Sequence, residues 1–472
     1  MRTHHNFFAL IILIALSSGS AAAQNRYAIK NVSVIPMNRE VVLSNQTVLI
    51  EDGIIKNIGN SGKVKIGKDY KVIDGTGKYL MPGLFDMHTH FFYEHGKHVN
   101  TNETELKLML ANGITMARIM TGHPSYLEAR ENVKTGKWIG PELKVACPQL
   151  VGRWPWSPDF KNYEIVASAE KATKAVKEFK EQGYDAIKIT FMMASEIFDA
   201  VVKAAAEENI KVVGHVGPIV KLPKALAAKQ QIEHMDMFIE MLLPDTSYNH
   251  GQSVSDFNIY SKAAWATVPH LDESKIPALA KSVKDAGIYV TPTNYFFITN
   301  AGLPFTDEEI KQKPDYNYLP SDSKEEKWKY RNSYLKNMAP LESREKYVHI
   351  RKKMVYELWK AGVPLMAGSD APEFFVVAGF SIHDELKTMV DAGLTPFAAL
   401  QTATVNPATF MEMNTRTGTI EAGKEADFLL LDKNPLEDIQ NTRAIHGVFT
   451  NSGWYDNDAV NNLLQQALVL GQ

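Results

Sequence analysis

Two histidines, His88 and His90, stand at the end of an apolar run that begins at Leu80. Residues two apart on a β-strand point to the same face of the strand. Two imidazoles on one face therefore form half of a suitable site for a transition metal. A single His-x-His pair more often has a purely structural role, so a metal site is predicted only if later residues supply the other ligands.

Four further residues with metal-binding or proton-transfer chemistry lie in or at the ends of later apolar runs. They are Lys188, His215, His234 and Asp370. A lysine inside an apolar strand is costly to bury unless another group compensates its charge. A neutral lysine amine can react with carbon dioxide, and the oxygens of the resulting carbamate could bridge two metal ions. Each residue alone has an ordinary structural interpretation, but their joint occurrence predicts a metal centre.

The middle of the chain alternates short apolar runs with amphipathic stretches of helical period. The runs are Leu84–His90, Ile114–Met120, Leu143–Leu150, Ala186–Thr190, Lys211–Val216, Gln231–Asp236, Tyr289–Phe296 and Pro364–Asp370. Eight strand–helix units predict an α/β fold, a (β/α)₈ TIM barrel over residues 81–417. A barrel would bring all six candidate ligands together at its mouth. An open doubly wound sheet is the alternative, but no Gly-rich phosphate turn follows the first strand.

The two ends of the chain have strand-like composition that differs from the middle. Residues 24–80 and 418–458 are rich in β-branched residues, which predicts one small β-sandwich domain built from both ends. Residues 459–472 are expected to be a C-terminal tail. Two insertions, 241–270 and 299–345, would follow barrel strands six and seven. Loops in these positions lie at the catalytic face, so we interpret them as walls or a lid, with a surface helical pair without a functional role as an equal alternative for 299–345.

Residues 1–23 have the features of a signal peptide. A weakly basic start precedes the apolar run from Phe7 to Leu16, which is too short to span a bilayer, and small residues follow it. We expect cleavage near Ala23–Gln24 and a periplasmic or secreted protein. Cys147 is the single cysteine, so an intramolecular disulfide is impossible. The apolar residues around it indicate a buried thiol rather than a nucleophile.

The bulk composition narrows the class of partner. The chain has 472 residues, 45% hydrophobic and 22% charged, with a formal net charge of −3. These values are ordinary for a globular protein and favour neither nucleic acid nor an acidic surface as a partner. After the leader, no stretch is long and apolar enough to span a membrane. The expected partner is a small-molecule substrate, and a homo-oligomer is compatible with the sequence.

The chain resembles the amidohydrolase superfamily in motifs that extend over nearly the whole predicted mature chain. The motifs are Pro82-Gly-Leu-Phe-Asp-Met-His-Thr-His90, Gly368-Ser-Asp370, Ala403-Thr-Val-Asn-Pro-Ala408 and Gly418-Thr-Ile-Glu-Ala-Gly-Lys-Glu-Ala-Asp427. The branch is similar to prolidases and imidazolonepropionases. The resemblance implies that His88, His90 and Asp370 bind the more buried of two metals. It implies that His215 and His234 bind the second, that carboxylated Lys188 (N6-carboxylysine) bridges them, and that both are zinc.

The activity implied by the resemblance is hydrolysis of an amide bond in a dipeptide or an N-acyl amino acid. Two metals would share a hydroxide and polarise the scissile carbonyl, while Asp370 would move the proton to the leaving group. A mononuclear deaminase of the same superfamily is one alternative, although Pro218 stands where such deaminases often carry a glutamate. Hydrolysis of a cyclic amide, lactone or phosphotriester, and metal or substrate binding without turnover, also remain open.

Residues for substrate recognition are less distinct in the sequence. Arg153 follows the third predicted strand and could bind a carboxylate. Aromatic residues near the predicted mouth could line an apolar pocket, and His123 just after the second strand is a further candidate. The aromatic candidates are Trp154, Trp156 and Tyr295. Ordinary loop packing explains each of these residues equally well.

Overall fold

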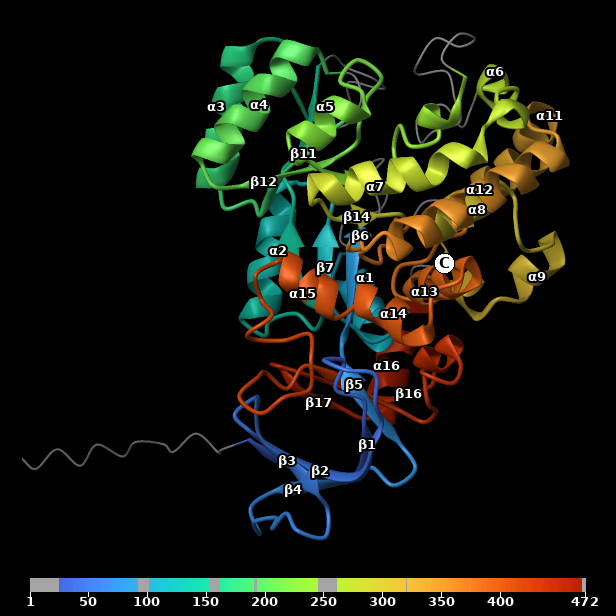
Figure 1. Cartoon of the computed structure of the whole chain (residues 1–472). Helices are drawn as coiled ribbons and strands as arrows, with labels where there is room; N and C mark the ends of the chain where they lie inside the picture. The colour runs from blue at the N-terminus through green and yellow to red at the C-terminus, as the bar shows by residue number, and fades with distance from the viewer. Residues whose placement is uncertain are drawn as a thin grey trace, which may run out of the picture.

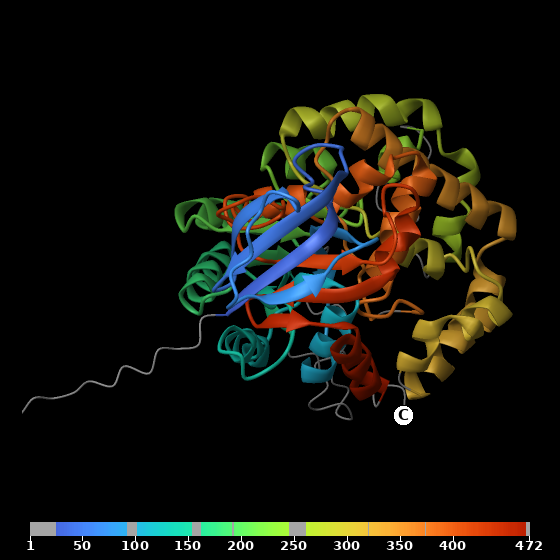
Figure 2. The ribbon, with the colours of Figure 1, turned by 90° about the horizontal axis from the view of Figure 1, so that it is seen from below.

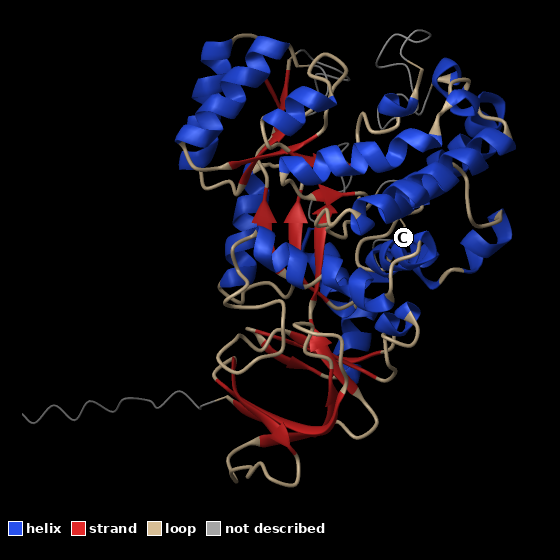
Figure 3. Cartoon of the chain, in the orientation of Figure 1, coloured by secondary structure: helices blue, strands red, loops and turns tan. Residues whose placement is uncertain are grey.

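The structure is a computed structural model that describes residues 25–91, 102–152, 162–190, 193–244, 261–319, 321–372 and 374–468. A β-rich part lies at one end, and a larger part with central strands and many helices lies above it (Figures 1 and 3). The predicted leader, 1–23, lies outside the described residues. In the part of the chain that is described, no helix has both the length and the apolar content needed to cross a bilayer.

Strands from both ends of the chain form one eight-stranded sheet with the order β17-β16-β15-β5-β1-β2-β3, in which β4 also pairs with β1. Its strands are β1 Arg26–Val34, β2 Leu43–Glu51, β3 Ile54–Asn60, β4 Lys71–Asp74, β5 Tyr79–Pro82, β15 Phe428–Leu431, β16 Ile445–Thr450 and β17 Gly453–Tyr455. Leu80 of β5 faces Leu430 of β15 in an antiparallel pair. The strands from the two ends therefore belong to one sheet, and the predicted β-sandwich built from both ends stays a prediction.

This sheet has its own apolar core. Alternating residues of β1 and β2, such as Ile29 and Val48, pack with Phe428 and Phe449 from the C-terminal strands. The core residues of β2, Val48 and Ile50, are two apart, but Thr47 and Leu49 beside them are buried as well, so both faces of this strand are partly covered. Figure 2 shows the sheet from below, in front of the helices of the larger part.

The strands of the larger part are all parallel and form two sheets. One sheet has the order β6-β7-β8, and the other has the order β10-β9-β11-β12-β13-β14. Their bounds are β6 Leu84–Thr89, β7 Ile114–Ile119, β8 Glu142–Val145, β9 Gln149–Val151, β10 Tyr163–Ile165, β11 Ala186–Ile189, β12 Lys211–Gly214, β13 Gln231–Glu233 and β14 Val290–Thr291.

Isolated contacts connect the edges of these two sheets. A parallel bridge joins Ala146 to Ala186, and another joins Val290 to Leu365. The Met87 N–H donates to the Ala367 carbonyl at 2.9 Å, which connects the segment after β14 to β6. The arrangement is TIM-barrel-like, but among the described residues the strands are not assigned as one closed sheet.

Two predicted strands differ from the structure for identifiable reasons. The run Leu143–Leu150 divides into β8 and β9, and Pro148, which has no N–H to donate, lies at the break. The run Pro364–Asp370 is not assigned as a strand beyond the bridge at Leu365. There the Ala367 N–H donates to Thr402 O at 2.8 Å instead of to a neighbouring strand.

Helices surround the parallel strands, with α3 and α4 on one side of the molecule and α12 and α13 on the other (Figure 1). The helices are α1 Asn102–Ala111, α2 Pro124–Lys134, α3 Ala169–Glu181, α4 Ser195–Glu207, α5 Leu222–Ala227, α6 Lys262–Trp265, α7 Ile276–Ala286, α8 Asn294–Asn300, α9 Asp307–Gln312, α10 Ser321–Lys329, α11 Lys336–Met338, α12 Leu341–Lys360, α13 Ser381–Ala392, α14 Pro396–Thr402, α15 Val405–Phe410 and α16 Asn457–Ala467. The Ser168 side chain caps α3, which buries Ala172, Val176 and Phe179.

Several of these helices lie where we expected other structure. The predicted strand Tyr289–Phe296 is short because α8 begins at Asn294. The expected tail 459–472 begins inside α16, which packs against α1 and buries Val460 and Leu463. The insertion 299–345 contains α9, α10 and α11. Part of the insertion 241–270, residues 245–260, lies outside the described residues.

Candidate metal centre

His88, His90 and Asp370 come together although they are far apart in the sequence. The ligand atoms of these three buried residues lie within 4.8 Å of one another. His90 Nε2 is 3.1 Å from Asp370 Oδ1, and His88 Nε2 is 3.4 Å from the same oxygen. Two imidazoles and one carboxylate around a common point form a donor set suited to zinc or a similar divalent ion.

Asp86 fixes the two chain segments that carry these ligands. Its Oδ1 accepts from the His88 N–H at 3.2 Å and from the Ser369 N–H at 3.0 Å. Its Oδ2 accepts from the Ser369 hydroxyl at 2.6 Å. Asp86 thus ties β6 to the turn before Asp370. Burial is the main cause that raises the pKa of Asp86, to about 7, and the Ser369 hydrogen bonds oppose that rise.

A glycine permits the close approach of these two segments. A Cβ at Gly368 would lie 2.7 Å from His88 Cβ and 2.6 Å from Thr291 Cγ2. Such distances are too short for real side chains, so the segment before Asp370 can lie against β6 only with glycine at this position.

His215 and His234 extend the cluster on its other side. The His234 ring is stacked on His215 with centroids 4.8 Å apart and lies 4.4 Å from the His88 ring. His234 Nδ1 is 3.6 Å from Asp370 Oδ2. Asp370 therefore has Oδ1 near His88 and His90 and Oδ2 near His234.

Lys188 is buried in the same region, with 1% of its surface exposed. Its side chain runs past Gly214 of the neighbouring strand β12, where a Cβ would lie 2.9 Å from Lys188 Cδ. Glycine at 214 thus leaves space for the lysine. Burial is the main cause that lowers the pKa of His88 and of His234, and the nearby Lys188 charge lowers both further. The imidazoles are thereby kept neutral, which is the form that binds metals.

The outer nitrogens of the histidines have hydrogen-bond partners. His88 Nδ1–H donates to Glu233 Oε2 at 2.8 Å, and His215 Nδ1–H donates to Asp236 Oδ2 at 2.8 Å. The Nε2 of His88 is buried and makes no hydrogen bond within the described structure. A carboxylate that holds one nitrogen and leaves the other available is the usual arrangement around metal-binding histidines. The residues present therefore fit a bound metal.

Three residues of the centre have backbone conformations that are uncommon for residues other than glycine. The φ angles are +64° at His234, +44° at Thr293 and +57° at Asp370. Such conformations persist only where surrounding structure holds them, and they cluster at functional sites. Arg351 provides part of that support, because its guanidinium donates to the carbonyl oxygens of His234 and Pro292.

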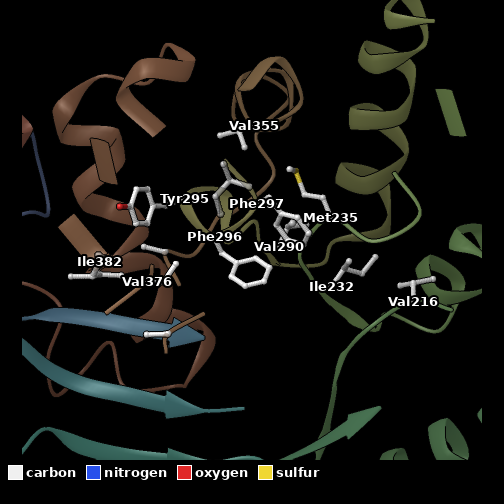
Figure 4. Close-up of a cluster of buried hydrophobic side chains, with 14 of the residues drawn as sticks. Val216, Ile232, Met235, Val290, Tyr295, Phe296, Phe297, Val355, Val376 and Ile382 are labelled. Carbon is white, nitrogen blue, oxygen red and sulfur yellow. The ribbon is translucent and has the colours of Figure 1, made fainter. Parts of the chain in front are cut away.

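The structure places the other predicted site residues differently. His123 caps α2, and its Nδ1 is 3.3 Å from the Ser125 N, which donates to it. Tyr295 is buried, and its hydroxyl accepts from Lys313 at 2.6 Å. Figure 4 shows its ring directed away from that of Phe296. Arg153, Trp154 and Trp156 lie outside the described residues.

Four charged residues of the centre escaped the sequence analysis. They are Asp86, Arg118, Glu233 and Asp236, all buried. Each occupies or adjoins an apolar strand, which is the signal that identified Lys188. A charged residue inside an apolar strand is costly to bury. Arg118 could have been identified in this way, since it lies within β7, whose residues are all buried.

Comparison with known proteins adds four likenesses. Residues 79–454 match the model of the amidohydrolase family. A 5-methylthioadenosine/S-adenosylhomocysteine deaminase from Caldanaerobacter subterraneus subsp. tengcongensis is 25% identical, covering 86% of this chain and 84% of that protein. An imidazolonepropionase from Flavobacterium psychrophilum is 21% identical over 81% of this chain and 84% of its own length. A Xaa-Pro dipeptidase structure with methionine bound in its active site has a TM-score of 0.64 and 20% identity, with 92% and 100% of the two chains covered.

Proposed function

The chain belongs to the amidohydrolase family, a family of metal-dependent hydrolases that act on carbon–nitrogen bonds, and we propose that this member is a binuclear enzyme that hydrolyses an amide bond. The family match supports the prediction of the prolidase and imidazolonepropionase-like branch. One observation carries the binuclear proposal. Asp370 Oδ1 lies 3.1 Å from His90 Nε2 and Asp370 Oδ2 lies 3.6 Å from His234 Nδ1, so one carboxylate lies close to both His90 and His234.

We propose that six residues of this chain hold the two metals. His88 and His90 with Asp370 would hold the first, and His215 with His234 would hold the second. Lys188 would bridge them as a carbamate, since its amine is buried close to the histidines, and conversion to a carbamate would give it oxygen ligands in place of a buried ammonium. Divalent metals, with zinc as the candidate, would supply an activated water and polarise the substrate carbonyl.

Asp370 is proposed to move the proton during turnover. Its carboxylate lies between the two histidine pairs, so it can accept a proton as water attacks the carbonyl carbon. The protonated carboxyl then donates to the leaving nitrogen, which would otherwise depart as a poor anion. Asp86 and Ser369 hold the chain beside it, so the carboxylate is oriented before the substrate binds.

The substrate class is proposed to be a dipeptide or an N-acyl amino acid. The fold similarity to a Xaa-Pro dipeptidase supports this choice. The deaminase among the sequence relatives favours a second candidate, a mononuclear deaminase. That candidate leaves the buried Lys188 without a role, and Pro218 follows His215 where a glutamate would be expected to shuttle the proton. Amide hydrolysis is therefore preferred.

Three further proposals concern the whole protein. The bridges at Ala146 and Leu365 support a (β/α)₈ barrel that closes around the site. Export through residues 1–23 remains a prediction, and N-terminal sequencing of the protein from its own cells should begin at Gln24. Assembly into a homo-oligomer also remains a prediction, which light scattering of the purified protein can test.

The proposed activity is tested by metal analysis together with a substrate screen. Metal-loaded protein should hold close to two divalent ions per chain and should release amino acid from part of a dipeptide and N-acyl amino acid library. Adenosine derivatives, which release ammonia when deaminated, serve as the comparison set. One ion per chain with ammonia release would favour the deaminase, and two ions without hydrolysis of any amide would refute the substrate class.

A further inference from the structure

We propose that Arg118 and Glu233 are positioning residues of the metal centre. Their buried ion pair sets which nitrogen of His88 is available as a ligand and fixes the orientation of the ring. The inference rests on the proposed function, because it concerns a ligand of the proposed metals. It assigns a role to two charged residues, 2% and 0% exposed, that the proposed reaction does not itself use.

Glu233 uses its two oxygens for two different partners. Oε2 accepts from His88 Nδ1–H at 2.8 Å, and Oε1 accepts from an Arg118 NH2 hydrogen at 2.7 Å. With the Nδ1 proton held by Glu233, the lone pair of His88 resides on Nε2. That nitrogen lies on the side of Asp370, at 3.4 Å from its Oδ1. The carboxylate therefore selects the tautomer that the metal centre requires.

Arg118 fixes the carboxylate by connecting four strands of the parallel sheets. It belongs to β7, its Nε donates to Met87 O of β6 at 2.6 Å, and its NH2 donates to Glu233 of β13. The same NH2 lies 3.4 Å from Thr291 Oγ1 of β14. A planar guanidinium with several fixed hydrogen bonds holds a carboxylate in one orientation better than an ammonium does. The position of Glu233, and through it of His88, thus depends on Arg118.

The second histidine pair is held in a different way. His215 Nδ1–H donates to Asp236 Oδ2, which also accepts from the Val216 N–H at 3.3 Å, while Asp236 Oδ1 makes no hydrogen bond in the described structure. Among the described residues, the carboxylate on the His88 side accepts a hydrogen bond from a buried guanidinium, whereas Lys188 and Arg351 act on Asp236 through their charge. Loss of the Arg118–Glu233 pair should therefore weaken one metal site selectively and leave the other nearly intact.

The test measures how fast each metal leaves the loaded protein to a colorimetric chelator. Three variants are compared. Glu233→Gln keeps the shape of the side chain, and Arg118→Met removes the charge. Arg118→Lys keeps the charge but lacks the planar guanidinium with its several N–H donors. Asp185→Asn is the control, since Asp185, directly before β11, forms an ion pair at 2.9 Å with Arg130 of α2. Circular dichroism and thermal unfolding confirm which variants are folded.

Unsubstituted protein should release its two metals in slow phases. In Glu233→Gln and Arg118→Met the release rate of one metal should rise about 10- to 100-fold, while that of the other stays unchanged. The rise in Arg118→Lys should be smaller than in Arg118→Met. If Arg118→Met does not fold, Glu233→Gln and Arg118→Lys decide the question by the same measure. Release rates equal to those of Asp185→Asn would overturn the positioning role. Unsubstituted protein that takes up no metal would overturn the metal centre itself.

Discussion

Asp86 and Ser369 are joined twice, by the backbone N–H and by the hydroxyl of Ser369, at 3.0 Å and 2.6 Å. This pair connects the first parallel strand to the turn that carries Asp370. Ser369→Ala removes the shorter bond and leaves a buried carboxylate oxygen without its donor, at a cost of about 1–3 kcal/mol. Urea unfolding should show this loss, and metal affinity should fall with it. Unchanged affinity would show that the turn is held by other contacts.

Lys188→Ala should abolish most turnover, because it removes the proposed bridging group from a buried position. Short carboxylic acids such as acetate should restore part of the activity, since a carboxylate can occupy the space and carry the same charge as a carbamate. Lys211→Ala is the control, because Lys211 forms its ion pair with Glu412 at the exposed start of β12. Full activity of Lys188→Ala without added acid would refute a bridging role.

Asp370→Asn should retain at least one metal and lose turnover by roughly 10²- to 10⁴-fold, the range ascribed to a positioned acid–base group. The amide keeps an oxygen near His90 but cannot accept and return a proton. Activity should be measured on the best substrate of the screen, and metal content by elemental analysis. A variant that loses both metals together with activity would assign Asp370 a ligand role alone.

Gly368→Ala should destabilise the protein and weaken metal binding together. The added Cβ would lie 2.6 Å from Thr291 Cγ2 and 2.7 Å from His88 Cβ, so one of the two segments must move. Overpacking of this kind costs about 1–3 kcal/mol. Gly62→Ala, in a turn of the β-rich part, is the control because the nearest atom to its added Cβ is 3.3 Å away. Similar thermal shifts for the two variants would contradict the close approach.

His383 predicts a pH dependence of stability that is independent of the metal centre. Burial lowers its pKa from 6.5 to about 3, while its Nε2–H donates to Asn112 O at 3.0 Å. Below pH ~6.5 the unfolded chain binds a proton at this residue and the folded chain does not. The free energy of unfolding therefore falls by about 1.4 kcal/mol per pH unit as the pH falls from 6.5 towards 3. Comparison of urea unfolding at pH 7 and pH 5 should show a smaller loss in His383→Gln than in the unsubstituted protein. Equal losses would show that His383 remains neutral in the unfolded chain or titrates in the folded one.

Much of the fold could be predicted because its apolar runs are short, regular and separated by amphipathic helices. Where prediction failed, a single residue decided the local structure. Pro148 interrupts the third run, and α8 begins at Asn294 inside the seventh. In the eighth run, Gly368 lets the chain lie against His88 instead of extending a strand. Which segment each of these runs contacts depends on the three-dimensional fold, and strand-like composition alone does not reveal it.

The sequence could predict that His88, His90 and Asp370 come together, and it could not predict the groups that orient them. Histidine and aspartate at strand ends indicate metal chemistry by their residue type alone. The role of Glu233 appears only when its distance to His88 is known, because a carboxylate beside a histidine in sequence does not reveal which histidine it holds. His123 and Tyr295 were candidates for substrate binding because of their residue type and their position after predicted strands. In the structure His123 caps α2, and the buried Tyr295 hydroxyl accepts from Lys313.

The pairing of β5 with β15 also bears on how the chain reaches its native state. Leu80 and Leu430 are neighbours in the β-rich sheet, yet all the parallel strands from β6 to β14 lie between them in the sequence. The N-terminal strands therefore cannot complete their sheet until nearly the entire polypeptide has been synthesised. Contacts of such long range slow folding, so β1 to β5 should acquire protection from hydrogen exchange late, after the parallel strands and their helices have assembled.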